Sequence, residues 1–201
     1  MAVSKLTSRQ TRKQVSVKDR VSEAEWEVRT DLAAAYHLAA IYGWTDIILT
    51  HFSARVPGPD NHFLLNAYGL MFDEVTASNL VKVDQEGNIL EDITGYGINQ
   101  AGFVIHGCIH GGRPDAHCVL HTHTRDGIAV SAMTEGVLPL SQHSMRIVRD
   151  VTYHDYEGIA LDLLPDPRAV APPRRPRVGL PADISHHLDD KRQALLPRRL
   201  R

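Results

Sequence analysis

Several residue types and patterns are scarce in this sequence, and each scarcity excludes a class of protein. Two cysteines, Cys108 and Cys118, among 201 residues are too few for a disulfide framework. No apolar run approaches the roughly 18–20 residues of a membrane span, and the polar segment 1–20 lacks the apolar stretch of a signal peptide. A formal net charge of −2 gives no support for nucleic-acid binding. We therefore expect a cytoplasmic protein that contacts neither membranes nor nucleic acids.

The sequence has enough apolar material for one folded domain, and its composition then changes. Hydrophobic residues make up 43% of the chain, which is sufficient for a core. Residues 165–201 hold seven of the eleven prolines, nine basic against four acidic residues, and no aromatic side chain. Such a segment buries too little apolar surface to fold alone. We predict a flexible segment over 1–21, a domain over 22–164 and a disordered tail over 165–201, which is either a basic docking segment or simply solvated.

The pattern over 22–164 predicts a mixed α/β fold, because helical and strand-like stretches alternate. Ser22 and Glu25 form a capping-box pattern that opens a helix ending near Gly43. This helix should face the core through Trp26, Ala33, Tyr36 and Ala40. Further helices are predicted over 100–111 and 126–133, with a short one opening at Thr76 or Ser78. Strands are predicted over 47–49, 52–56, 62–65, 81–84, 89–90, 117–123, 144–148 and 151–156.

The sharpest local signal is the pair His121 and His123, which follows the apolar residues 118–120. Side chains at i and i+2 of a strand share a face, roughly 6.5–7 Å apart along the backbone. Two imidazoles at that spacing can converge on one divalent metal, although a catalytic zinc usually takes three protein ligands. The alternative is that one of the two is a half-buried structural residue and the other lies on the surface.

The other histidines give weaker signals. His106 and His110 lie at i and i+4 on one predicted helix face, but no HExxH-type glutamate accompanies them, so packing is expected. His143 and His154 are candidate catalytic residues, as further ligands or proton carriers. The alternative for each is a hydrogen-bonded structural role.

Five short blocks occur together and in order: INQAGF at 98–103, RPDA at 113–116, HTH at 121–123, AVSAM at 129–133 and YHDYEG at 153–158. Together they resemble the class II aldolase/adducin family over about residues 22–163. The resemblance implies a three-layer α/β/α domain with a mostly antiparallel central sheet, a bound Zn²⁺ or similar divalent metal, and a ring-shaped homotetramer. It also implies a small hydroxy-carbonyl or sugar-phosphate-like substrate that is cleaved or epimerised while the metal stabilises the developing charge.

Carried over by position, the resemblance assigns the metal to His121 and His123. It assigns substrate binding to Asn66, Gly69, Gln100 and Ala101, although Gln100 and Ala101 replace a pair of serines that holds phosphate in the aldolases. By the same alignment, His51 stands where those enzymes have an asparagine. His143 falls where a neighbouring subunit supplies a tyrosine.

Two departures from the aldolases bear on activity. Gly102 stands at the position of their catalytic glutamate, and the Asn-His-Gly segment that carries their third metal histidine does not occur. The matching stops near Asp162, where the composition changes. We hypothesise that residues 165–201 arise from a shifted reading frame and that the C-terminal part of the fold is missing. We expect a metal-binding, aldolase-like lyase or epimerase of impaired activity. The alternative is a non-catalytic adducin-like interaction module of the cytoskeletal, actin-binding type, because block 99–103 is similar to the adducin side of the family.

Overall fold

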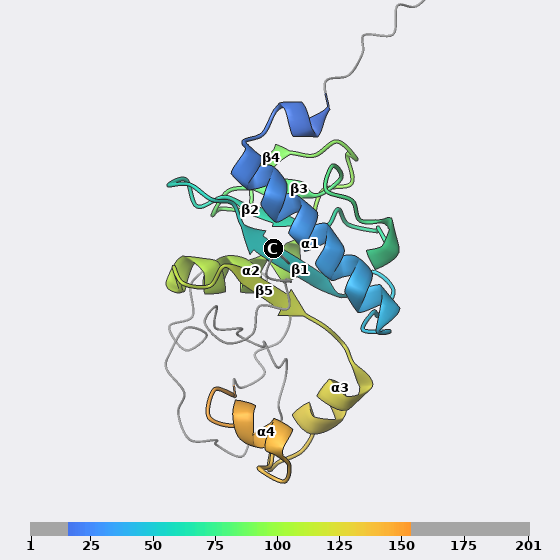
Figure 1. Ribbon diagram of the computed structural model, residues 1–201, viewed down its shortest axis with the longest axis vertical. Coiled ribbons are helices and arrows are strands. Elements are labelled where there is room, and N and C mark those ends of the chain that lie inside the picture. Colours follow the sequence, from blue (N-terminus) through green and yellow to red (C-terminus); the bar gives the residue numbers. More distant parts are fainter. Residues whose placement is uncertain (1–15, 154–201) are drawn as a thin grey trace, which may run out of the picture.

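The computed structural model describes residues 16–153, whose arrangement is shown in Figure 1. Predictions for His154, for the strand over 154–156 and for the tail over 165–201 lie outside the described residues. The helical elements are η1 (Val17–Asp19), α1 (Glu23–Ile41), η2 (Phe72–Glu74), α2 (Gln100–Gly112), α3 (Arg125–Ser131) and α4 (Gln142–Ile147). The strands are β1 (His51–Arg55), β2 (Phe63–Leu65), β3 (Val81–Val83), β4 (Ile89–Glu91) and β5 (Cys118–His121).

The described strands form one sheet in the order β4-β3-β2-β1-β5, and every neighbouring pair is antiparallel. In the middle of β1, Ser53 pairs with Leu65 of β2 on one side and with Val119 of β5 on the other. His51, the first residue of β1, pairs with His121, the last residue of β5. The register therefore brings two histidines that are 70 residues apart in sequence to the same end of the sheet.

Alternation along the strands gives the sheet two apolar faces. Phe52 and Leu64 are buried in one cluster with Leu32 and Tyr36 of α1, whereas Phe63 and Leu65, which point to the opposite face, are buried with Phe103 of α2. α1 and α2 therefore cover opposite faces of the sheet, as Figure 1 shows. The predicted three-layer α/β/α arrangement with an antiparallel sheet is confirmed.

The first helix begins as predicted, because the Ser22 hydroxyl accepts a hydrogen bond from the Glu25 amide at 3.1 Å. The Glu25 side chain does not reach back to complete a capping box, so that part of the prediction is wrong. Its two oxygens instead accept from Arg29 Nε at 3.0 Å and Lys82 Nζ at 2.7 Å. Of the four predicted core positions of α1, Ala33 and Tyr36 are buried, whereas Trp26 and Ala40 are only partly buried.

Four further local predictions are wrong. Residues 47–49 form a turn, and Ile47 has a φ of 51°, which is incompatible with a strand. Residues 144–148 fall in and just after α4, because Ser141 caps that helix through a bond from the Ser144 amide. The stretch after Thr76 is a turn rather than a helix. The Thr76 amide donates a hydrogen bond to Asn79 Oδ1 at 2.7 Å, which links the two ends of this turn. Residues 151–153 are not a strand.

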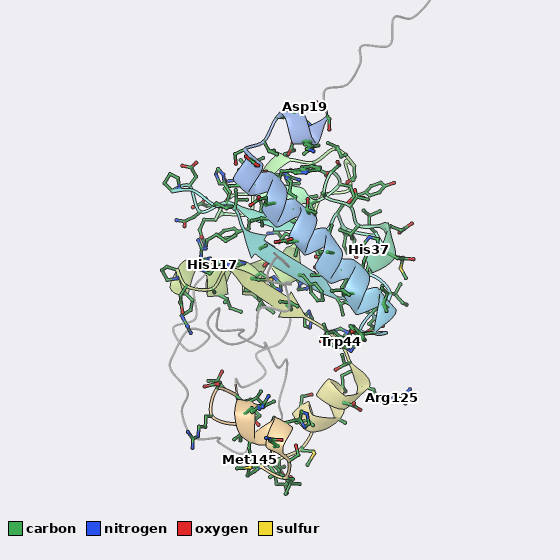
Figure 2. The ribbon with its side chains drawn as sticks, in the orientation of Figure 1. Asp19, His37, Trp44, His117, Arg125 and Met145 are labelled. Carbon is green, nitrogen blue, oxygen red and sulfur yellow. The ribbon has the colours of Figure 1, made fainter. Side chains whose placement is uncertain are left out.

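The segment after β5 has a different character from the sheet. α3 and α4 contain no buried residue, and both lie apart from the sheet in Figure 1. Figure 2 shows Met145 on α4 well away from Trp44, which follows α1, whereas Arg125 at the start of α3 lies nearer to it. None of the helices formed by residues 16–153 is long and apolar enough to span a bilayer.

Candidate metal centre

Three neighbouring parts of the fold bring the candidate histidines together. His51 and His121 face each other across β1 and β5, and His123 follows two residues after His121, just beyond the end of the strand. Asp46 comes from the turn between α1 and β1. The side chains of His121 and His123 therefore come together, as the predicted period-2 alternation requires, although the strand ends at His121.

The two candidate metal ligands turn the same ring nitrogen toward each other. His121 Nε2 lies 3.1 Å from His123 Nε2. His123 Nδ1 lies 2.8 Å from Asp46 Oδ2, and His121 Nδ1 lies 3.2 Å from His51 Nε2. A ligating histidine in a metalloprotein characteristically uses its other ring nitrogen for a hydrogen bond of this kind, which fixes the ring. Asp46 and His51 thus occupy supporting positions behind the two candidate ligands.

A buried polar chain continues behind His51 into the space between the sheet and α2. His51 Nδ1 lies 2.9 Å from His106 Nε2, and His106 Nδ1 lies 2.7 Å from Ser53 Oγ. Ser53 Oγ is also 2.8 Å from His110 Nε2. Burial holds the pKa of His106 well below its usual 6.5, and the neighbouring His51, His110 and His121 add to the effect. His106 is therefore neutral at physiological pH.

The packing role expected for His106 and His110 is only part of what they do. Both rings are buried, and His110 stacks on Phe63 at 4.5 Å between centroids. Their i, i+4 spacing was a usable signal of a shared face, but nothing in the sequence showed that this face meets Ser53. Ser53 and Asp46 were missed altogether. Ser53 shares the face of His51 and Arg55 on a strand whose other two side chains, Phe52 and Ala54, are apolar, which was a weak signal, whereas Asp46 gave none.

Gly102 and His51 fit together as a pair. A Cβ atom at position 102 would lie 2.2 Å from His51 Nε2, so the imidazole fills the space that any side chain there would need. Asn99 caps α2 by accepting from the Gly102 amide at 3.2 Å. Where the resemblance places a glutamate in aldolases, this chain therefore has an imidazole that comes from a different element.

The other candidate residues are placed less uniformly. Gln100 and Ala101 lie in the first turn of α2, next to Gly102. Gly69 is exposed with a φ of +92°, and the Asn66 side chain is buried, with Oδ1 2.9 Å from the Tyr36 hydroxyl. His143 is exposed on α4, apart from the sheet, and His154 lies outside the described residues.

The chemistry of this cluster fits a divalent metal in part. Imidazole nitrogen suits zinc, iron, copper and nickel, and tetrahedral bonds of 2.0–2.1 Å to zinc place two nitrogens about 3.3 Å apart. The 3.1 Å separation of the two Nε2 atoms is close to that value. Across residues 16–153, no group of three or more histidine, cysteine or carboxylate side chains forms a complete ligand set. A metal held by His121 and His123 would need its remaining ligands from substrate, water or residues beyond that range.

Comparison with known proteins places this chain and its fold in a family. The family model described as "Class II Aldolase and Adducin N-terminal domain" matches residues 30–198. A putative aldolase class 2 protein of Caulobacter vibrioides is 58% identical over 157 residues, covering 78% of this chain and 61% of that protein. Alpha-adducin of Mus musculus is 47% identical over 136 residues, covering 67% of this chain and 18% of the adducin.

A solved structure gives the same result for the fold. The crystal structure of an aldolase II superfamily protein from Pseudomonas syringae is 68% identical, with a TM-score of 0.73, and the match covers 74% of this chain and 60% of that one. The chain thus spans about 61% of the length of its bacterial relative. Because the family model, the relatives and the solved structure agree, the chain belongs to the class II aldolase and adducin N-terminal domain family.

Proposed function

We propose that this chain is a divalent-metal-binding, aldolase-like protein that performs lyase or epimerase chemistry on a small hydroxy-carbonyl or sugar-phosphate-like compound. The observation that carries the proposal is the pair of Nε2 atoms 3.1 Å apart, each on a ring whose Nδ1 is already engaged by Asp46 or His51. The name of the Caulobacter vibrioides relative, a putative aldolase class 2 protein, points the same way.

The proposed chemistry divides between the metal and the residues around it. A bound divalent metal would polarise the substrate oxygens and stabilise the charge that develops when a bond to carbon breaks. The backbone amides in the first turn of α2, at Gln100 and Ala101, are at a helix N-terminus, which is suited to an anionic group of the substrate. Gly102 offers no carboxylate for proton transfer, so we expect slower turnover than in an enzyme that has one there.

Metal content is the direct test. The full chain, purified and loaded with zinc, should hold about one ion per chain, and His121→Ala and His123→Ala should each lose it. His62→Ala is the matched control, because this histidine lies in the β1–β2 connection outside the cluster. Equal metal content in all four proteins would refute the assignment of the ion to this pair.

A second candidate function is a non-catalytic, adducin-like interaction module of the actin-binding type. The observation that favours it is Gly102, because aldol chemistry through a group at that position is impossible. The 47% identity to alpha-adducin supports the same alternative. Absence of bound metal and of turnover on hydroxy-aldehyde and keto-acid panels, together with co-sedimentation with actin filaments, would favour it over the first proposal.

A further inference from the structure

A continuous hydrogen-bonded chain runs from a buried backbone carbonyl to the candidate metal ligands. Each consecutive contact along it is between 2.7 and 3.2 Å. Its members are contributed by β1, α2, the α2–β5 connection and β5. In order they are the Ala116 carbonyl, His110, Ser53, His106, His51 and His121.

The carbonyl end fixes the direction of the first bonds. The Ala116 oxygen has no hydrogen, so His110 Nδ1, 3.0 Å away, must donate to it. In the neutral ring this leaves His110 Nε2 as an acceptor. The Ser53 hydroxyl, 2.8 Å away, then donates its one hydrogen to His110.

The same reasoning gives the direction of each following hydrogen bond, from Ser53 to His121. Because the Ser53 hydrogen is used on His110, Ser53 Oγ accepts from His106 Nδ1 at 2.7 Å. His106 is fully buried and neutral, so its Nε2 accepts from His51 Nδ1 at 2.9 Å. In neutral His51, Nε2 then accepts from His121 Nδ1 at 3.2 Å. In neutral His121, the Nε2 atom therefore presents a lone pair.

The opposite end of the cluster gives the same answer for the second ligand. An ionised carboxylate only accepts, so His123 Nδ1 donates to Asp46 at 2.8 Å. The Nε2 atom of neutral His123 is then also a lone pair, and it faces His121 Nε2 at 3.1 Å. At this distance either a proton held between the two Nε2 atoms or a bound metal ion removes the repulsion of two facing lone pairs. The hydrogen-bond directions thus converge on a position that favours a cation.

We propose that Ser53, His106 and His110 are positioning residues, which set the tautomer of the metal ligand His121 through His51 from inside the protein. The proposal rests on the metal-binding function proposed above. It predicts one uncommon state for the whole group: His51, His106 and His110 all carry hydrogen on Nδ1 rather than on Nε2. Replacing Ser53 removes the only group that joins His106 to His110 in this chain of contacts, and it releases the tautomers of the rings beyond it.

Histidine NMR on the full chain tests the direction of the chain without any metal. Protonated and unprotonated ring nitrogens resonate far apart in long-range ¹H–¹⁵N spectra of ¹⁵N-histidine-labelled protein, and each ring is assigned by its own substitution. In the metal-free wild type, His51, His106 and His110 should show hydrogen on Nδ1. In the zinc-loaded wild type, His121 and His123 should show hydrogen on Nδ1 and a ligated Nε2. Hydrogen on Nε2 of His51 or His106 in the wild type would overturn the proposal, and this reading needs no variant to fold.

Zinc affinity then tests whether the chain matters to the site. Ser53→Ala should change the tautomers of His106 and His51 and weaken zinc binding by about 10–100-fold, the range found when groups behind metal ligands are removed. Ser53→Thr keeps the hydroxyl and should bind zinc as the wild type does. Thr50→Val is the matched control, since Thr50 is buried one position before His51 and its hydroxyl makes no hydrogen bond within the described residues.

The outcomes separate the two proposals. Wild-type zinc affinity in Ser53→Ala would overturn the positioning role while leaving the metal-binding function intact. No zinc binding by the wild type would overturn both, and the histidine spectra would then report only the structure of the buried chain. Loss of affinity in Thr50→Val as large as in Ser53→Ala would also overturn the positioning role, because any disturbance of this strand would then have the same effect.

Discussion

Asp46 is the group on which the orientation of His123 depends most directly. It lies in a turn, 42% of its side chain is exposed, and its carboxylate holds His123 Nδ1 at 2.8 Å. Asp46→Asn keeps an oxygen that accepts the hydrogen bond from His123. It removes the negative charge that raises the basicity of the His123 ring as a metal ligand. We expect zinc affinity, measured by competition with a chromophoric chelator, to fall by about 10-fold or more. Asp60→Asn, in the exposed β1–β2 turn, should leave the affinity unchanged, and an equal loss in both variants would contradict this role.

The fit of His51 over Gly102 predicts a strong coupling between these two positions. A glycine-to-alanine change inside a helix ordinarily stabilises by about 1 kcal/mol, but here the new Cβ would meet His51 Nε2 at 2.2 Å. We expect Gly102→Ala to destabilise by about 1–3 kcal/mol in urea denaturation. Gly111→Ala, on the same helix, meets only the flexible end of Gln85 and should cost less.

A shorter side chain at position 51 should remove the clash with a Cβ atom at position 102. In the His51→Asn background, Gly102→Ala should cost little, which gives a coupling free energy of about 0.5–3 kcal/mol between the two positions. Asparagine is also the residue that the resemblance places there in aldolases. Additive effects of the two changes would show that His51 is free to move away, contrary to its buried position between His106 and His121.

His106 makes the folded protein sensitive to acid. Burial, chiefly, lowers its pKa well below 6.5 in the folded state, so below about pH 6.5 the unfolded chain takes up a proton there that the folded chain does not. The stability that the neutral ring contributes is present above that pH and is lost as the pH falls. We expect the free energy of unfolding to drop more steeply below pH 6.5 in the wild type than in His106→Asn, by about 1.4 kcal/mol per pH unit. Parallel pH profiles for the two proteins would contradict this.

At the scale of elements, a buried network of ion pairs stabilises the packing of α1 against the sheet, together with apolar contacts. Arg29 is fully buried and donates to Glu25 at 3.0 Å, to Glu91 at 2.7 Å and to the Leu80 carbonyl at 2.9 Å. Lys82 of β3 completes the network by donating to Glu25 at 2.7 Å. The network therefore joins α1 to β3 and β4 by ion pairs and hydrogen bonds, in addition to the apolar packing of this helix.

Removing the arginine should leave buried carboxylate charge without its main partner. We expect Arg29→Ala to lower the free energy of unfolding by about 3–5 kcal/mol, the range for breaking a buried ion pair from one side. Arg125→Ala, at the exposed start of α3, should change it by no more than about 0.5 kcal/mol. Urea denaturation of the three proteins is the measurement, and a small effect at Arg29 would show that the network is dispensable.

The elements differ in how far the sequence determines them. α1 and α2 were predictable because a side-chain cap and a long apolar face act within one segment, as at Ser22 and Asn99. The apolar residues of 47–49 and 144–148 carry strand-like side chains, yet local bonds decide their structure: a left-handed Ile47 in one case and the Ser141 cap in the other. The pair His121 and His123 was predictable from alternation alone. The residues that hydrogen-bond to the histidines of the site were not predictable, because their positions depend on which strands become neighbours. Asp46 and Ser53 reach the histidines only through the topology of the sheet.

On the scale of the whole molecule, the described chain has a well-buried part and an uncovered part. The sheet, α1, α2 and the connections between them hold every buried residue of the three apolar clusters, whereas α3 and α4 bury none. Large apolar side chains are exposed there, with Ile128 at 54%, Leu140 at 83% and Met145 at 61%. Large apolar side chains left exposed are a feature of association sites when they form a common surface.

We therefore expect the chain to self-associate through the segment that contains α3 and α4, in keeping with the tetramer that the family resemblance implies. Leu140→Asp combined with Met145→Asp places two charges on this surface, where desolvation would oppose burial against another copy. Light scattering coupled to size exclusion should show a smaller assembly for this double variant than for the wild type. Glu86→Lys with Asn88→Lys, in the exposed β3–β4 turn, is the matched pair that should leave the mass unchanged. A wild type that runs as a monomer at all concentrations would mean that this apolar surface does not mediate self-association.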